Sequence, residues 1–558
     1  MNRITTLRAL AASTLALGLA ACGGGDSSVA SSPAPSPTPA PAPAPSPAPA
    51  FSITLDTDKV VVLQGASASL HATLHRDAGF TDAVQVTLGA LPAGVSAGPV
   101  QFAAGSTEAT VVLSAAAAAP HSLPTAARVQ GQAGATTATT PLTVTVRGLP
   151  GVVDTSFAGG VVRQAVDIGE DYANAVAVQA DGKVIVAGSS ATATGTCISL
   201  VRFLRDGAVD TSFGVAGKVL TQVGARGNDA AQAVAVQPDG RIVVAGASDQ
   251  GASGLDFVVL RYRADGSLDT DFGNGGKVVA DFAGDTDRAW ALLLQPDGKI
   301  VAGGEANTGT GAGGTGVDFA LLRLNADGSP DAAFGRHGQV VTAVGANTAT
   351  DVVHGLAIQG VQGEAAILAV GGDGDFRAVR YRADGALDTR FGNQGVVAGL
   401  FGSVIGGARA VAVLPTGQAV VAGQVNHHFA AVQLTSGGTL DAAFGVGGRF
   451  ERSVAANWNE AMALVRQDDG KLILGGWAYT GPGSSGDFAA LRLAADGTLD
   501  TTFGDAGVTI IATAPGTKDD QGRALALQPD ERVPTVRVLQ AGPSNDSNHD
   551  FALLRLWL

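Results

Sequence analysis

Aspartate recurs at two fixed positions in the repeated units of residues 149–558. Proteins bind cations with clustered carboxylates of this kind. The first set lies eight residues before the end of a predicted strand and comprises Asp171, Asp229, Asp287, Asp351 and Asp520. If these strands surround one axis, their aspartates ring the mouth of a central channel, where the negative potential attracts a cation or a basic partner. The alternative, favoured by recurrence in five units, is that each carboxylate accepts backbone N–H bonds in its own turn.

The second set opens another strand of the same units. It comprises Asp256, Asp318, Asp375, Asp487 and Asp550, with Cys197 and His428 at equivalent places. These residue types can ligate metals, but the copies stand in separate units, about 10 Å further from the axis than the first set. They cannot share one ion, so we expect turn caps and no metal site.

Other chemistry-bearing patterns are few. Trp458, Trp477 and Tyr479 belong to one unit and could form an aromatic patch for a sugar or a peptide, although core packing explains them as well. The run Gly309–Gly314 has dinucleotide-fingerprint spacing, but no helix is predicted after it to hold a pyrophosphate. No His-Glu-x-x-His, nucleophile elbow or Cys-x-x-Cys is present. We therefore predict no cofactor and name no catalytic residue.

The elements that position these residues come from a repeat. A phrase resembling Leu-Asp-Thr-x-Phe-Gly places its phenylalanine at 157, 213, 272, 334, 391, 444 and 503. One unit reads as four strands, at 233–237, 241–245, 257–262 and 277–281, with Asp239-Gly240 as the turn between the first two. Four strands per unit of this length are typical of propeller blades.

The ends of the array are staggered by one strand. A fourth-type strand at 160–165 precedes the first complete triplet, and the last unit stops after its third strand at 551–556. The fold class predicted is all-β, a seven-bladed β-propeller of four-stranded blades, in which the N-terminal strand completes the last blade. Such closure also removes an exposed sheet edge.

The repeated phrases, among them Ala233–Gly246 and Asp256–Tyr262, resemble the delta-60 repeat family of bacterial β-propellers. The resemblance covers residues 149–558 and implies a propeller, while the family itself is largely of unknown function. It therefore indicates architecture and no activity.

An ion pair is predicted to recur with the repeat. The third strand of most units ends in arginine, and an aspartate follows in the Leu-Asp-Thr phrase, as in Arg261 and Asp269. Arg555 has no downstream partner, but Asp154 precedes the strand at 160–165. If the ring closes, Arg555 should meet Asp154. Because the pairs recur, we interpret them as structural.

The N-terminus predicts export. Arg3 and Arg8 precede an apolar run that ends in Leu19-Ala20-Ala21-Cys22, which resembles the lipobox of bacterial lipoproteins. The resemblance implies a signal peptide over 1–22, lipidation of Cys22 and an outer-membrane lipid anchor. A Pro/Ala-rich linker over 23–50 follows, and strand-like segments over 51–148 suggest an immunoglobulin-like β-sandwich.

Charge and cysteine content narrow the function classes. The net charge of −14 argues against nucleic acid, whose phosphates need a basic surface. Once Cys22 is lipidated, Cys197 has no disulfide partner. We expect a monomeric, lipid-anchored binding or scaffold protein of the cell envelope, non-enzymatic, with an unknown protein or glycan ligand on the face of variable loops. The alternatives are an accessory lipoprotein of envelope assembly and a polysaccharide-acting hydrolase or lyase.

Overall fold

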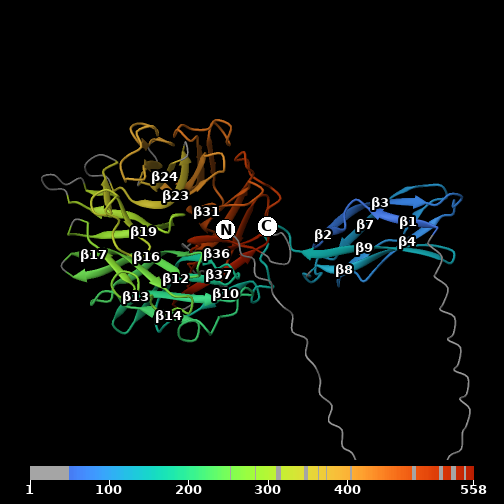
Figure 1. Ribbon diagram of the computed structural model, residues 1–558, viewed down its shortest axis with the longest axis horizontal. Helices are drawn as coiled ribbons and strands as arrows, with labels where there is room; N and C mark the ends of the chain where they lie inside the picture. The colour runs from blue at the N-terminus through green and yellow to red at the C-terminus, as the bar shows by residue number, and fades with distance from the viewer. Residues whose placement is uncertain are drawn as a thin grey trace, which may run out of the picture. The chain divides into compact units, whose positions relative to one another are not determined.

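The computed structural model describes residues 50–558 except 123, 252, 283, 310–315, 345–349, 362–363, 373, 403–404, 481–485, 514–518, 530–535 and 546–547 (Figure 1). Every regular element of these described residues is a β-strand, which confirms the all-β class. Among the same residues, no helix is long and apolar enough to cross a bilayer.

Residues 51–147 form two sheets of their own. One has the strand order β1 (Phe51–Leu55), β3 (Ser67–Arg76), β7 (Glu108–Ala115), β5 (Val95–Ala97). The other has the order β2 (Lys59–Leu63), β9 (Thr136–Arg147), β8 (Thr125–Ala133), β4 (Val84–Gly89), β6 (Val100–Phe102). Alternate residues such as Phe51 and Ile53 are buried while Ser52 and Thr54 are exposed, because each sheet turns one face to a shared core.

The described part of residues 161–556 forms seven four-stranded antiparallel sheets. In six of them the strands follow chain order. The first two sheets are β11 (Asp171–Val178), β12 (Val184–Thr192), β13 (Gly195–Phe203), β14 (Lys218–Thr221), and β15 (Asp229–Val236), β16 (Ile242–Gly251), β17 (Gly254–Tyr262), β18 (Lys277–Ala280). The third and fourth are β19 (Asp287–Leu294), β20 (Ile300–Asn307), β21 (Val317–Leu324), β22 (Gln339–Thr342), and β23 (Val353–Val361), β24 (Glu364–Gly371), β25 (Arg377–Tyr381), β26 (Val396–Val397). The fifth and sixth are β27 (Gly406–Val413), β28 (Ala419–Val425), β29 (His428–Leu434), β30 (Arg449–Arg452), and β31 (Asn459–Arg466), β32 (Leu472–Tyr479), β33 (Gly486–Leu493), β34 (Val508–Ile511).

The seventh sheet joins the two ends of the array. Its strands are β35 (Ala524–Pro529), β36 (Val536–Asn545), β37 (His549–Leu556) and β10 (Val161–Gln164). Val161 is the register partner of Leu554, and Gln164 that of Phe551. Figure 1 shows β10 beside β37, although the two strands come from opposite ends of the array.

Neighbouring sheets pack face to face. The second strands, such as β12, are almost wholly buried, because a sheet lies against each of their faces. Each core cluster combines residues of adjacent sheets, as where Ile185 packs with Val244. Val186 of the first of these sheets shares a cluster with Leu539 of the last. The tight turn between first and second strands uses Gly240 with φ of 85°, a conformation that favours glycine.

The first strands begin earlier than the sequence predicts. The pattern placed one of them at 233–237, whereas β15 starts at Asp229. An irregularity between Ala231 and Ala233 separates the two halves of the strand. The irregularity shifts the alternation of side chains between the two faces of the strand by one position. A search for strict alternation therefore finds only the second half of the strand.

Candidate functional site

A central cavity of about 720 Å³ lies where the first strands of the seven sheets converge. Every one of these seven sheets contributes lining residues, three of them from each of β11, β15 and β19. The residues of the first strands that line this space are therefore the candidates for a site that all seven sheets share.

One side chain at an equivalent position of each sheet lines the cavity, in six of the seven sheets from a β-bulge of the first strand. Register shifts occur at six equivalent positions, and in the seventh sheet the corresponding residue directly precedes β35. A bulge inserts one extra residue and re-aims its side chain. We call these seven residues the bulge ring: Asn174, Gln232, Trp290, His354, Arg409, Met462 and Arg523, all of which line the cavity.

Glycines in the second strands make room for the bulges. A Cβ built on Gly246 would lie 1.9 Å from the Ala230 carbonyl oxygen, and one on Gly304 would lie 1.8 Å from that of Arg288. The same close approach, between 1.7 and 2.1 Å, occurs in all seven sheets, at Gly188, Gly246, Gly304, Gly371, Gly423, Gly476 and Gly542. Any larger residue would push the first strand out of its bulged path. The close approach of the bulged first strand thus explains why the repeated phrase Ala233–Gly246 ends in glycine.

Sequence reasoning missed the bulge ring, although a signal was present. The ring residue stands three positions after the aspartate of the first set and is flanked by small residues, as in Ala231-Gln232-Ala233 and Ala408-Arg409-Ala410. Its type differs in nearly every unit, while the surrounding phrase is repeated. A position whose residue type varies within an otherwise repeated strand indicates a role in function and not in holding the fold together.

A polar network joins three neighbouring sheets along the cavity wall. Arg409 donates to Glu460 Oε1, with N···O distances of 2.9 Å from Nε and 2.8 Å from Nη2. Its Nη1 lies 2.6 Å from His354 Nε2. Burial, reinforced by the Arg409 charge, lowers the pKa of His354 to about 3. The imidazole is therefore neutral near pH 7, with Nε2 as acceptor and the proton on Nδ1.

Arg523 provides a second guanidinium. Its Nη1 donates to Asn174 Oδ1 at 2.6 Å and its Nη2 to Gln521 Oε1 at 2.9 Å. The Tyr172 ring centroid lies 5.7 Å from the guanidinium carbon, within cation–π range. Burial lowers the pKa of Arg523. Within the described residues, no salt bridge joins Arg523 to a carboxylate.

The aspartates of the first set do not line the central cavity. All five are buried, none lines the cavity, and each accepts a backbone N–H from the segment before its own strand. The contacts are Val166 N to Asp171 (2.6 Å), Val223 N to Asp229 (2.7 Å), Phe282 N to Asp287 (2.7 Å), Val344 N to Asp351 (3.2 Å) and Thr513 N to Asp520 (2.9 Å). These hydrogen bonds are the contacts that the turn-capping alternative describes.

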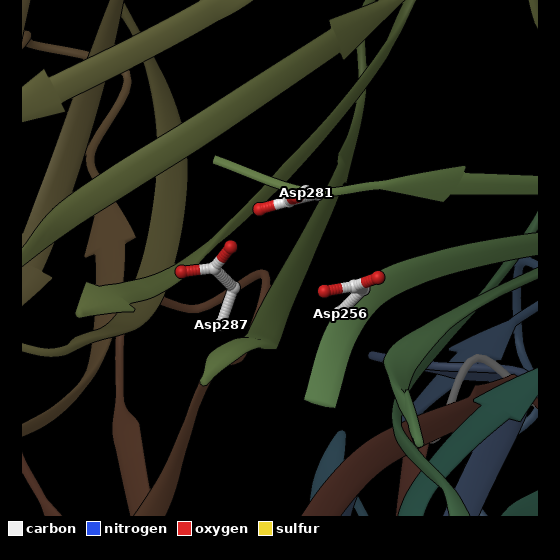
Figure 2. Close-up of side chains that lie close together, drawn as sticks. All are labelled: Asp256, Asp281 and Asp287. Atoms are coloured by element: carbon white, nitrogen blue, oxygen red, sulfur yellow. The ribbon is translucent and has the colours of Figure 1, made fainter. Parts of the chain in front are cut away.

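Members of the two aspartate sets meet at one sheet junction. Asp256 of β17, Asp281 after β18 and Asp287 of β19 bring carboxylate oxygens within 4.8 Å of one another (Figure 2). Burial raises the pKa of Asp287 to about 6, and it also raises the pKa of Asp256. Carboxylate oxygens are ligands that a divalent cation can use. The sequence prediction considered only whether aspartates of the same set could share an ion. It therefore missed that Asp256 of the second set lies beside Asp287 of the first.

The three aromatic residues named from the sequence lie together. The ring centroids of Trp458 and Trp477 are 6.1 Å apart, and those of Trp477 and Tyr479 are 5.0 Å apart. His427 stacks on the outer indole at 4.3 Å. Trp477 is 8% exposed and lines the cavity, whereas Trp458 is 42% exposed. The cluster therefore reaches from the cavity wall to the surface.

The ion pairs are buried at equivalent corners of the sheets. Arg261 Nε lies 2.8 Å from Asp269 Oδ2, and Arg555 Nε lies 2.9 Å from Asp154 Oδ2. Each guanidinium also lies on the phenylalanine of the repeated phrase, at 4.6 Å for Arg261 over Phe272. In four of the remaining sheets the ion pair joins Arg202 to Asp210, Arg323 to Asp331, Arg380 to Asp388 and Arg492 to Asp500. In the fifth, Gln433 Nε2 donates a hydrogen bond to Asp441 Oδ2 at 2.8 Å in place of the ion pair.

Of the two cysteines, only Cys197 lies within the described residues. Cys22, the predicted lipidation site, lies outside the described residues. Cys197 is buried on β13, and burial raises the pKa of its thiol to about 11. A protonated, buried thiol is a weak nucleophile and a poor metal ligand.

Family comparison agrees with the sheet architecture. A family model described as a domain of unknown function (DUF5122) beta-propeller matches residues 179–213, 237–272, 295–334, 365–391 and 467–503. Together with the four-stranded sheets, these matches support a β-propeller in the repeated part of the chain. No curated protein sequence matches the chain.

Solved structures give distant similarities. A DUF4784 family protein from Bacteroides caccae is 11% identical, covering 69% of this chain and 92% of that one, with a TM-score of 0.25. The tail fibre of Staphylococcus aureus phage P68 is 11% identical over 71% and 94%, with a TM-score of 0.21. Prolyl oligopeptidase B from Galerina marginata is 9% identical over 82% and 55%, with a TM-score of 0.30. Scores this low support no inference about function.

Proposed function

We propose that the seven four-stranded sheets are the blades of one closed propeller over residues 149–558, completed by β10. Three contacts support closure, since they join the last sheet to the first. Arg555 Nη1 donates to the Arg205 carbonyl at 2.8 Å, and Gln528 Nε2 donates to the Gly182 carbonyl at 2.8 Å. Arg205 Nη1 in turn donates to the Pro529 carbonyl at 2.6 Å. The strand β11 also packs against β35, β36 and β37.

We further propose that the propeller is displayed from the outer membrane by a lipid on Cys22, through the linker 23–50 and an immunoglobulin-like sandwich over 51–148. The lipobox-like Leu19–Cys22 motif and the two-sheet core of residues 51–147 support this order of parts. Incorporation of labelled palmitate into the wild-type chain, and its loss in Cys22→Ala, would test the anchor.

The function that the site supports best is non-enzymatic ligand binding at the cavity, on the face that carries the variable loops. One observation carries this proposal: six β-bulges and the equivalent position before β35 bring seven side chains of mostly different type to the wall of a single space. A position with a purely structural role would be expected to carry the same residue type in every sheet. Variation there, on a rigid frame, is typical of a binding site.

Array binding with a matched control tests the proposal. The mature protein is screened on glycan and peptide arrays beside two double variants. Gln232→Ala with Met462→Ala removes two ring side chains, and Asp239→Asn with Asp469→Asn alters two turns on the opposite face. We expect ring substitution to abolish binding and the turn substitution to preserve it. Binding that survives in the ring variant but disappears in the turn variant would place the site on the other face.

A further inference from the structure

We infer that the central cavity binds a small oligosaccharide that carries carboxylates, an oligouronate, and that Arg523 is its anchor. This inference rests on the proposed binding function and adds the chemical class of the ligand.

The cavity carries more cationic than anionic groups. Arg409 is held by Glu460, whose carboxylate neutralises it. Arg523 is bonded instead to the amide oxygens of Asn174 and Gln521. The charges of Asp519 and Glu460 act on Arg523, but neither carboxylate forms an ion pair with it among the described residues. A half-buried guanidinium in this state is costly to desolvate, and a bound anion lowers that cost. The local excess of positive charge stands out in a chain whose net charge is −14.

A carboxylate fits this guanidinium. Asn174 and Gln521 each engage a terminal nitrogen of Arg523, which leaves further N–H groups of the planar fork available. Arginine binds planar carboxylates through two parallel hydrogen bonds, a geometry that a lysine cannot reproduce. An anion in the cavity would thus complete the hydrogen bonding of Arg523 while neutralising its charge.

The size and the remaining lining indicate a sugar. A volume of about 720 Å³ falls within the range of small-molecule sites, so the occupant is a short oligomer or the end of a longer one. Trp290 lines the cavity and is partly exposed, so its indole can pack on the apolar face of a pyranose ring. Trp477 lines the same space but is only 8% exposed, packed against Trp458 and Tyr479. The Gln232 amide lines the same space and can pair with sugar hydroxyls. An acidic peptide would use the charge but offers no pyranose face to the Trp290 indole.

Calorimetric titration with trigalacturonate tests the inference on the full chain. We expect saturable binding that weakens as salt is added, since charge attraction is screened. The neutral trisaccharide maltotriose, which lacks carboxylates, should not bind. Arg523→Gln should weaken trigalacturonate binding by about tenfold or more, whereas Arg523→Lys should retain part of it. Circular dichroism checks that both variants keep their strand content.

Arg288→Gln is the matched control. Arg288 lies on the same strand as Trp290, forms an ion pair with Glu305 and does not line the cavity. Its substitution should leave the affinity for trigalacturonate unchanged. An equal loss in both variants would mean that overall surface charge, and not Arg523, drives binding.

Two further probes separate failure of this inference from failure of the proposed function. If triglutamate, inorganic phosphate or maltotriose binds in an Arg523-dependent way and trigalacturonate does not, the ligand class is wrong while the cavity remains a binding site. If none of the four probes binds and the ring variant matches the wild type on the arrays, both proposals are overturned.

Discussion

Replacing Asp154 by alanine should open the junction between the two ends of the array. Asp154 is fully buried, and its Oδ2 lies 2.9 Å from Arg555 Nε and 2.8 Å from Arg555 Nη2. Arg537 Nε lies 2.9 Å from the same oxygen. The substitution leaves two guanidinium groups without their shared counter-charge, in a place where water cannot replace it.

The expected cost follows from burial. Removing one partner of a buried ion pair destabilises a protein by about 3–5 kcal/mol, since the remaining charge stays desolvated. The Asp154 and Arg555 backbones keep a hydrogen bond of 2.7 Å, so β10 should loosen rather than detach permanently. If amide exchange in β10 and β37 occurs through this opening, it should accelerate by roughly two to nearly four orders of magnitude.

Hydrogen exchange followed by mass spectrometry reads this out on peptides covering 158–166 and 549–558. Asp269→Ala is the matched control, because Arg261 and Asp269 make the same buried pair within a sheet whose strands are continuous in sequence. Its effect should stay in β17 and β18, where only a short chain segment links the partners.

If Asp154→Ala leaves exchange in β10 and β37 at the wild-type rate, while Asp269→Ala accelerates exchange around β17, then the Arg555 pair does not hold the two ends together. Closure would then depend on backbone pairing of β10 with β37 alone.

Three further outcomes are expected. Because burial raises the pKa of Asp287 to about 6 from its ordinary 3.8, the folded state takes up a proton in that window. The free energy of unfolding should therefore fall as the pH rises from about 4 to 6, by up to about 3 kcal/mol. Urea titrations of the wild type and Asp287→Asn should differ in this slope, and parallel curves would contradict the assignment. Cys197, with a pKa of about 11 and 4% exposure, should resist iodoacetamide at pH 8 until the chain is unfolded, and rapid labelling of the native protein would disprove its burial. Phe213→Ala should cost about 3–5 kcal/mol, because the ring is fully buried beneath the Arg202 guanidinium at 4.6 Å. Val215→Ala, at an 81% exposed site, should change stability by less than about 0.5 kcal/mol in the same melts, and similar losses in both would contradict the packing argument.

Local sequence determined the elements of this protein. The Asp-Gly turn at 239–240 and the phrase ending in Phe213 recur with a fixed spacing, and a repeated four-strand unit has few ways to bury its two apolar faces. The all-β class and the propeller followed from that repetition. The partners Arg261 and Asp269 were also predictable, since they are eight residues apart and flank one corner.

Only the tertiary structure decided where side chains point. The bulge at Gln232 breaks the two-residue alternation, so the sequence pattern could not assign that residue to the cavity. For the same reason it placed Asp229 at the channel mouth, whereas the carboxylate lies buried against backbone N–H groups. The meeting of Asp256 with Asp287 depends on two different sheets packing together. Such contacts arise from the arrangement of units in space, which no single repeat encodes.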